Sequence, residues 1–234
     1  MKNKILEEAN KDIPLYFSDF ESFWKESIDN ISDDDLAEIY GATLVYKNWK
    51  MSFHNMGLQE YDIVVNEIFE DINSSFFLSL MGLYRSAHMH LRSSIELTFQ
   101  LIYFIHHPIE YMKWKDGNFV IKHDTLTQYI KGNPMFDNDI ESLINTITTS
   151  WKKFSKHIHG ESPIFFQCEK DARKTNSFSV GDFNIWKGNY MKNIYLLNKL
   201  LLLFFKNKLN QFPSKSRDFL VGRLKADDLK LIES

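Results

Sequence analysis

The sequence predicts an all-α protein, a multi-helix bundle built around a long central helix. Residues that break helices are scarce, with 9 Gly and 5 Pro among 234 residues. Long stretches place apolar residues every three or four positions, which is the period of a helix with one buried face. The composition is 44% hydrophobic and 25% charged, which is typical of a globular chain with a sizeable core. We therefore expect one helical domain over residues 1–234.

The N-terminal helices are expected within residues 1–72. One or two helices fit residues 1–31. A helix start follows at Ser32, where an N-cap residue precedes three aspartates that favour the positive end of the helix dipole. This helix should end near Gly57, and a further amphipathic helix fits residues 58–72. The pattern leaves open whether that helix continues into the next segment or breaks near Ser74.

A core is expected over residues 73–160, and its centre is the segment from Ser74 to His107. The segment contains no proline and a single glycine, Gly82. Helical spacing relates the apolar residues Phe77, Leu80, Tyr84, Ala87, Leu91, Ile95, Ile102 and Ile105, together with Thr98. The core should end with a helix from Asn138 that stops at Gly160, a residue suited to a C-terminal cap.

A polar row shares one face of the central segment, because its members follow each other at steps of three or four residues: Arg85, His88, Arg92 and Glu96. Charged groups among Phe, Leu and Ile must be paired, since an unpaired buried charge is costly. One interpretation is a structural ion-pair network. The other is a cleft that binds an anion, because the planar guanidinium of arginine suits phosphate or carboxylate.

The remaining segments are a loop at 161–181 and a long C-terminal helix with a tail at 182–234. The stretch from Ser162 to Gly181 lacks a helical period, so it is interpreted as a functional loop, a small hairpin or a disordered segment. The following helix is expected to run from Asp182 to about Asn210. Shorter helices are expected between Pro108 and Gly117 and from the capping-box pattern at Thr125.

Composition and motif content exclude several classes of protein. The net charge of −3 gives no global basic signature of nucleic-acid binding. The single cysteine, Cys168, excludes an internal disulfide and fits a reducing compartment. The first residues lack the apolar core of a signal peptide, and the most apolar run, from Ile194 to Phe205, is too short to span a bilayer. We expect a cytoplasmic protein that makes no contact with a membrane.

No cofactor or metal is expected. The sequence has no phosphate-binding glycine loop and no C-x-x-C, H-E-x-x-H or G-x-S-x-G motif. The pair His106 and His107 lacks a carboxylate or cysteine at a known ligand spacing. Candidate chemistry therefore rests on histidine, lysine and arginine side chains on helices.

A second candidate site lies at the end of the helix that starts at Asn138. Ser155 and His159 are four residues apart and share a face, with Lys152 and Lys156 on the same side. The alternative is that four basic residues simply complement the negative end of the helix dipole: Lys152, Lys153, Lys156 and His157. If this helix packs antiparallel to the central one, Arg85, Arg92 and Glu96 could face Ser155 and His159. Arginine would then hold a phosphate while histidine moves a proton.

The segments LYRSAHMHLRSSIEL, IYFIHHPIEYMKW and WKKFSKHIHG resemble a diffuse group of bacterial all-helical proteins of HEPN-like type, over about residues 76–160. The Arg-x4–6-His signature of that group falls on Arg85 and His90. A continuous helix places these two residues about 140° apart. In the Ser-Lys-x-x-His-Gly element, Lys152 and Lys153 stand where an arginine would precede His159.

The resemblance implies a metal-independent RNase or toxin component of an antiphage or toxin–antitoxin system. Arg85 and Arg92 would bind phosphate, His159 or His90 would act as acid and base, and Glu96 would orient an arginine. Proteins of this type commonly dimerise, and some keep only the helical scaffold. The alternative is therefore a non-catalytic binding or regulatory subunit of a defence complex. The implied partners are RNA, a partner protein of a defence operon and a second copy of the chain.

Overall fold

The computed structural model describes residues 2–17, 20–136, 140–159 and 178–233, with the side chains of 2–3, 12–17, 20–24, 158–159 and 233 left aside. These residues form helices joined by turns and contain no strand, which confirms the all-α prediction. The expected loop or hairpin near 162–181 falls almost entirely outside this part of the chain. None of the described helices is long and apolar enough to cross a membrane.

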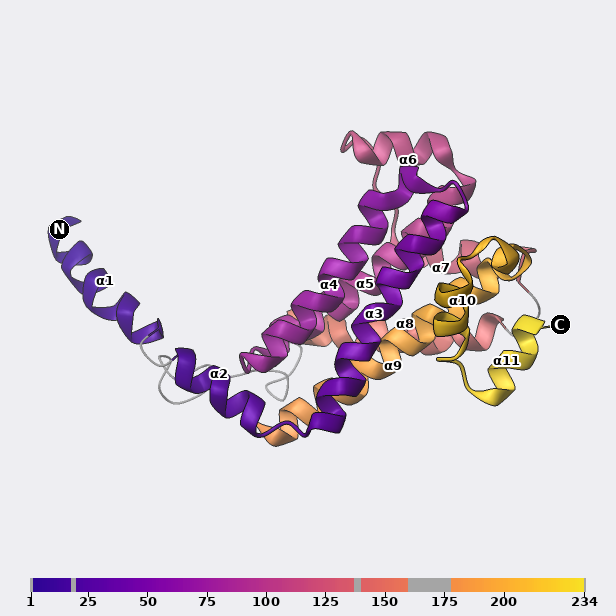
Figure 1. The fold of residues 1–234 in the computed structure, drawn as a ribbon. Helices are drawn as coiled ribbons and strands as arrows, with labels where there is room; N and C mark the ends of the chain where they lie inside the picture. Colours follow the sequence, from indigo (N-terminus) through magenta and orange to yellow (C-terminus); the bar gives the residue numbers. More distant parts are fainter. Residues whose placement is uncertain (1, 18–19, 137–139, 160–177, 234) are drawn as a thin grey trace.

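Helix α1 (Lys2–Phe17) extends away from the bundle, whereas α2 (Phe20–Asp29) contacts α4 (Asp62–Leu80) (Figure 1). Helix α3 (Asp33–Asn55) begins as expected at Ser32, whose Oγ accepts a hydrogen bond of 3.1 Å from the backbone N–H of Asp35. The helix ends at Asn55, and the chain then turns at Gly57, which has a positive φ of 72°. A 3-10 turn (Gln59–Tyr61) then leads into α4.

The prediction of one continuous helix from Ser74 to His107 is wrong. Helix α4 (Asp62–Leu80) passes through Ser74 without a break, and the chain then turns at Gly82 into α5 (Tyr84–His106). Gly82 has a φ of 68°, and the N–H of Leu83 donates to the carbonyl of Leu78 at 2.8 Å. This is the bonding pattern of a glycine helix terminus. The result is an antiparallel hairpin of two helices.

The second half of the chain adds the remaining layers. Helix α8 (Ile140–His159) follows α6 (Pro108–Lys115) and α7 (His123–Lys131), so α7 starts two residues before the expected Thr125. Helix α9 (Val180–Phe204) ends earlier than the expected Asn210, because a 3-10 segment (Lys206–Gln211) replaces its last turns. Helices α10 (Ser214–Val221) and α11 (Ala226–Glu233) form the tail.

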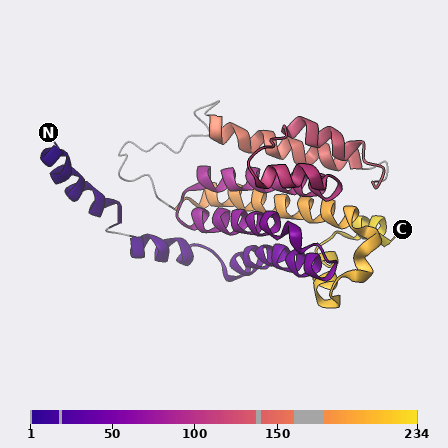
Figure 2. The ribbon, with the colours of Figure 1, turned by 90° about the horizontal axis from the view of Figure 1, so that it is seen from above.

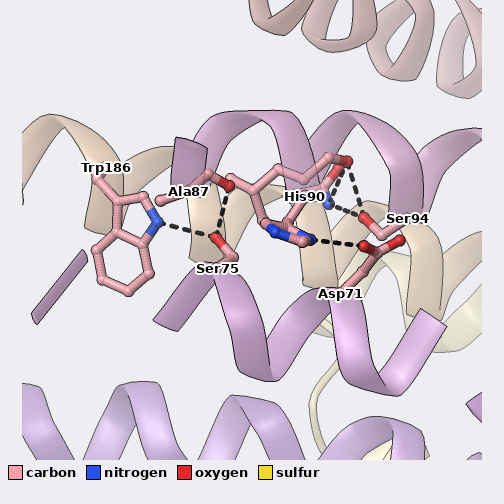
Figure 3. Close-up of polar contacts among 8 residues, drawn as sticks. Asp71, Ser75, Ala87, His90, Ser94 and Trp186 are labelled. Carbon is pink, nitrogen blue, oxygen red and sulfur yellow. Dashed lines mark hydrogen bonds and ion pairs between the residues drawn. The ribbon is translucent and has the colours of Figure 1, made fainter. Parts of the chain in front are cut away.

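Helix α5 lies at the centre of the bundle, packed against α4, α7, α8 and α9. Helices α8 and α3 lie on opposite sides, with α5 and α9 between them (Figure 2). Tryptophans tie α9 to its neighbours through polar bonds inside the core. Trp186 Nε1 donates to Ser75 Oγ at 3.0 Å (Figure 3), and Trp49 Nε1 donates to Asn198 Oδ1 at 2.9 Å. These bonds fix how far α9 is shifted along α4 and α3.

Replacing Gly82 with alanine should destabilise the protein by about 1–2 kcal/mol, because an L-residue is strained at a positive φ. Gly188→Ala is a matched control. Gly188 lies inside α9, and an added Cβ would meet nothing within 4 Å, so this change should raise stability by about 0.5–1 kcal/mol. Urea denaturation measures both effects, and equal effects of the two changes would contradict the role assigned to Gly82.

Candidate functional site

The polar row on α5 faces α8, and the two helices run antiparallel. Arg85 Nε donates to the carbonyl of His157 at 2.6 Å near one end of the contact. Trp151 Nε1 donates to Glu96 Oε1 at 2.9 Å near the other end. We call this contact the α5–α8 seam, defined by Arg85, His88, Arg92 and Glu96 of α5 and by Trp151, Phe154 and His157 of α8. The seam joins the polar row of α5 to the end of α8 that carries the second candidate site, although Ser155, Lys152 and Lys156 are not among its members.

Arg92 and Glu96 form an ion pair inside the seam, with Arg92 Nη2 2.9 Å from Glu96 Oε1. About three quarters of each side chain is shielded from solvent, with 25% of Arg92 and 29% of Glu96 exposed. The guanidinium also lies 5.0 Å from the centre of the Trp151 ring, in a cation–π contact. The ion pair expected between these two residues is thus present in the structure. Glu96 holds both Arg92 and Trp151 in place.

His123 of α7 extends this cluster. Its ring is stacked on Trp151 with a centroid distance of 4.1 Å and on Phe99 at 5.3 Å. Burial is the main cause that lowers the pKa of His123 to about 4, although Asp124 acts in the opposite direction. The imidazole is therefore neutral at pH 7 and acts as a flat apolar surface beside Arg92.

His88 and His157 are stacked in the other half of the seam, with ring centres 4.3 Å apart. His88 Nδ1 lies 2.7 Å from the carbonyl of Tyr84, and its Nε2 lies 2.9 Å from Asn189 Nδ2. Lys153 Nζ donates to Asn189 Oδ1 at 3.0 Å, which leaves the amide nitrogen of Asn189 to donate to His88. This chain of bonds fits a neutral His88 with its proton on Nδ1.

Burial also lowers the pKa of both stacked histidines. The pKa of His88 falls to about 3, chiefly through burial and then through the neighbouring His157. The pKa of His157 is lowered by burial and then by the charges of Lys153 and Arg85. Both imidazoles are neutral at pH 7, so the positive charge of the seam comes from Arg85 and Arg92.

The other candidate residues of α8 differ in their exposure to solvent. Ser155 is buried, and its hydroxyl donates to the carbonyl of Trp151 at 2.9 Å within the same helix. Lys152 and Lys156 are exposed. The side chain of His159 lies outside the described part of the structure. Ser155 therefore has its hydroxyl proton engaged and does not face Arg92 or Glu96 through a hydrogen bond.

His90 is turned away from the seam, towards α4 (Figure 3). Its Nδ1 lies 2.7 Å from Asp71 Oδ1, and the Asp71 side chain is only 7% exposed. Arg85 contacts α8 while His90 contacts α4, so the Arg-x4-His signature does not bring its two residues together within one chain. The helical spacing had already separated them by about 140°.

Sequence reasoning gave no site role to four residues of this region: Trp151 as a polar partner, His157, which was expected only to complement the helix dipole, His123 and Asn189. Only His157 had a usable signal, because it lies three residues after Phe154 and so shares part of the buried face of α8. The described residues contain no group of three or more side chains able to hold a metal ion. No family model matches the chain, and comparisons with curated proteins and with solved structures also found no match.

Replacing Glu96 with leucine should destabilise the protein by about 1–3 kcal/mol, because Arg92 loses its ion pair and Trp151 loses its acceptor. Glu67→Leu is the control, since Glu67 is an exposed carboxylate on α4, and it should change stability by about 0.5 kcal/mol or less. Chemical denaturation of both variants measures the difference. An unchanged midpoint for Glu96→Leu would show that water, not the protein, stabilises Arg92.

The stability of the protein should fall as the pH falls below 6.5. The unfolded chain binds a proton at His88 near its ordinary pKa of 6.5, whereas the folded protein resists it down to about 3. This difference should remove about 1–2 kcal/mol between pH 7 and pH 5. His88→Gln should make the loss smaller by about that amount. Urea denaturation at pH 5, 6 and 7 tests this, and parallel pH profiles for the two proteins would refute it.

Proposed function

We propose that the chain is an HEPN-like RNA-processing protein that holds RNA phosphates along the α5–α8 seam and cleaves RNA without a metal. The proposal assigns it to a bacterial antiphage or toxin–antitoxin system in the cytoplasm. Its partners would be RNA, a protein of the same operon and a second copy of the chain. The resemblance over residues 76–160 suggests this setting, and the geometry of the seam supports the chemistry.

The observation that carries the proposal is the pairing of Arg85 with His157. Arg85 Nε donates to the backbone carbonyl of His157 at 2.6 Å, and the charge of Arg85 is one cause of the lowered pKa of the His157 imidazole, after burial and Lys153. A guanidinium and an imidazole from different helices therefore lie close together. His157 is half buried, and its lowered pKa keeps it neutral at pH 7. A neutral imidazole can accept a proton, and a guanidinium can stabilise a phosphate that gains negative charge.

These two groups fit cleavage of RNA by its own 2′-hydroxyl. His157 would take the proton of the 2′-hydroxyl while that oxygen forms a bond to phosphorus. The bond from phosphorus to the 5′-oxygen then breaks, and this oxygen takes a proton from water. The products would be a 2′,3′-cyclic phosphate and a 5′-hydroxyl. In this scheme His157 takes the place that sequence reasoning gave to His159 or His90.

The exposed lysines would extend the binding surface. Lys152, Lys153 and Lys156 lie on the outer side of α8, close to the seam. With Arg85 and Arg92 they outnumber the single carboxylate of the seam, Glu96. The affinity for RNA should therefore fall steeply as the salt concentration rises, because a protein that binds several phosphates displaces counterions from the nucleic acid.

A second candidate is a non-catalytic helical subunit that binds RNA or a partner protein. The observation in its favour is how many candidate groups are already engaged. Ser155 bonds within its own helix, His88 is held between Tyr84 and Asn189, and Arg92 is paired with Glu96. In this case the seam would bind phosphate and leave the RNA intact.

Cleavage and binding can be separated by incubating the pure protein with labelled RNA in the presence of EDTA. We expect His157→Asn to abolish cleavage while binding changes little, and Arg85→Ala to weaken binding roughly tenfold as well. Lys113→Ala, which removes an exposed charge on α6, is the control and should match wild type. His90→Gln and His159→Gln compare the histidines chosen from sequence.

The outcomes distinguish the two candidates. RNA binding without cleavage by wild type supports the non-catalytic subunit. Cleavage that survives His157→Asn but is lost in His90→Gln or His159→Gln moves the catalytic role away from the seam. No RNA binding at low salt contradicts the nuclease and the RNA-binding subunit, and leaves only a subunit that binds a partner protein.

A further inference from the structure

A separate cavity lies on the other side of the bundle, between α3, α9 and the turn that joins α10 to α11. Its volume is about 400 Å³, which falls within the range of small-molecule sites. Neither the α5–α8 seam nor the proposed RNA chemistry uses it. Its lining combines basic side chains, Lys192, Arg223 and Lys225, with an apolar wall that includes Val45, Met191 and Ile194.

Arg223 is held in position by two neighbours. Its guanidinium lies over the ring of Phe219, 5.0 Å from the ring centre. It also lies against the backbone of Gly41 in α3, so closely that a Cβ at this position would come within 2.6 Å of Arg223 Nη2. Glycine weakens the interior of a helix. A glycine at residue 41 is explained if the space next to its Cα must hold the guanidinium of Arg223.

The charges around the cavity are not neutralised by one another. No carboxylate in the described part of the chain lies within 4 Å of the charged groups of Arg223, Lys192 or Lys225, and Glu38 is the single acid among the residues that line the cavity. Asp228 interacts electrostatically with Lys225 but is already paired with Lys199 at 2.6 Å. Lys225 Nζ lies 5.3 Å from the centre of the Tyr195 ring, which fixes it beside the cavity. A positioned guanidinium with two ammonium groups nearby favours a doubly charged oxyanion.

We propose that this cavity binds a small phosphate monoester whose phosphate contacts Arg223, Lys192 and Lys225. The apolar wall of Val45, Met191 and Ile194 would receive the organic body of the ligand. The planar fork of Arg223 can bond two phosphate oxygens at once, and its fixed position avoids ordering a flexible side chain on binding. Free inorganic phosphate would leave the apolar wall exposed to water and should bind less well.

Isothermal titration calorimetry with phenyl phosphate, AMP and inorganic phosphate tests the proposal, with phenol and adenosine as uncharged counterparts. We expect the two monoesters to bind wild type at least roughly tenfold more tightly than their uncharged counterparts. Gly41→Ala should weaken the binding of both monoesters roughly tenfold, because the new Cβ displaces the guanidinium while leaving its charge on the chain. Arg223→Gln should weaken it at least as much.

Matched controls separate the site from general effects. Gly188→Ala adds the same methyl group to α9 where nothing lies within 4 Å, and Lys113→Ala removes a distant positive charge, so both should bind like wild type. The melting temperature of Gly41→Ala should be unchanged or higher, because alanine stabilises a helix interior relative to glycine and this gain offsets the displaced contact with Arg223. A seam variant, Arg85→Ala, should also bind the monoesters normally.

Three results would overturn the proposal. The first is that neither monoester binds wild type more tightly than about 1 mM. The second is that Gly41→Ala and Arg223→Gln bind as well as wild type or no worse than the two controls. The third is that inorganic phosphate binds as tightly as phenyl phosphate, which would contradict the role of the apolar wall.

Discussion

The structure depends on polar bonds from α5 to three of the helices packed against it, α4, α8 and α9. His90 reaches Asp71 of α4, Glu96 accepts from Trp151 of α8, and Ser94 accepts from Asn193 of α9 at 2.9 Å. An apolar interface tolerates a small shift of one helix along another, whereas a shift here would leave buried polar groups unpaired at a cost of about 1–3 kcal/mol each. These bonds therefore fix the register of the bundle, and through it the geometry of the seam.

Apolar periodicity predicted most helices. Its failure is seen at one of three glycines that follow a helix end. Gly57, Gly82 and Gly117 all have positive φ and all end a helix. Two of these ends were expected, because Asn55 and the polar residues around Gly117 interrupt the apolar pattern. Gly82 stands inside the run FFLSLMGLYRSAH, where the apolar residues continue at helical spacing on both sides. Spacing alone cannot distinguish one helix from two whose buried faces remain in phase across a turn.

For the candidate site, the sequence could predict which residues share a face of one helix, but not which residues of two helices meet. Helical spacing placed Arg85, His88, Arg92 and Glu96 on one face, and the structure brings these side chains to the seam. Which residue of α8 meets them depends on the crossing of two helices about 60 residues apart in sequence, and spacing within one helix contains no information about that crossing. His157 therefore meets Arg85, and the hydroxyl of Ser155 is retained within α8.

Positive charge is concentrated on opposite sides of a chain whose net charge is −3. The arginines of the seam and the exposed lysines of α8 beside it spread several charges along one side of the bundle. This arrangement suits a polymer with many phosphates, whose binding releases several counterions and depends steeply on salt. The cavity beside Arg223 gathers three cations around about 400 Å³, so it suits one phosphate group, whose binding depends weakly on salt and strongly on the position of a single guanidinium. Net charge averages over both surfaces, and the arrangement of charges decides which kind of anion each of them can hold.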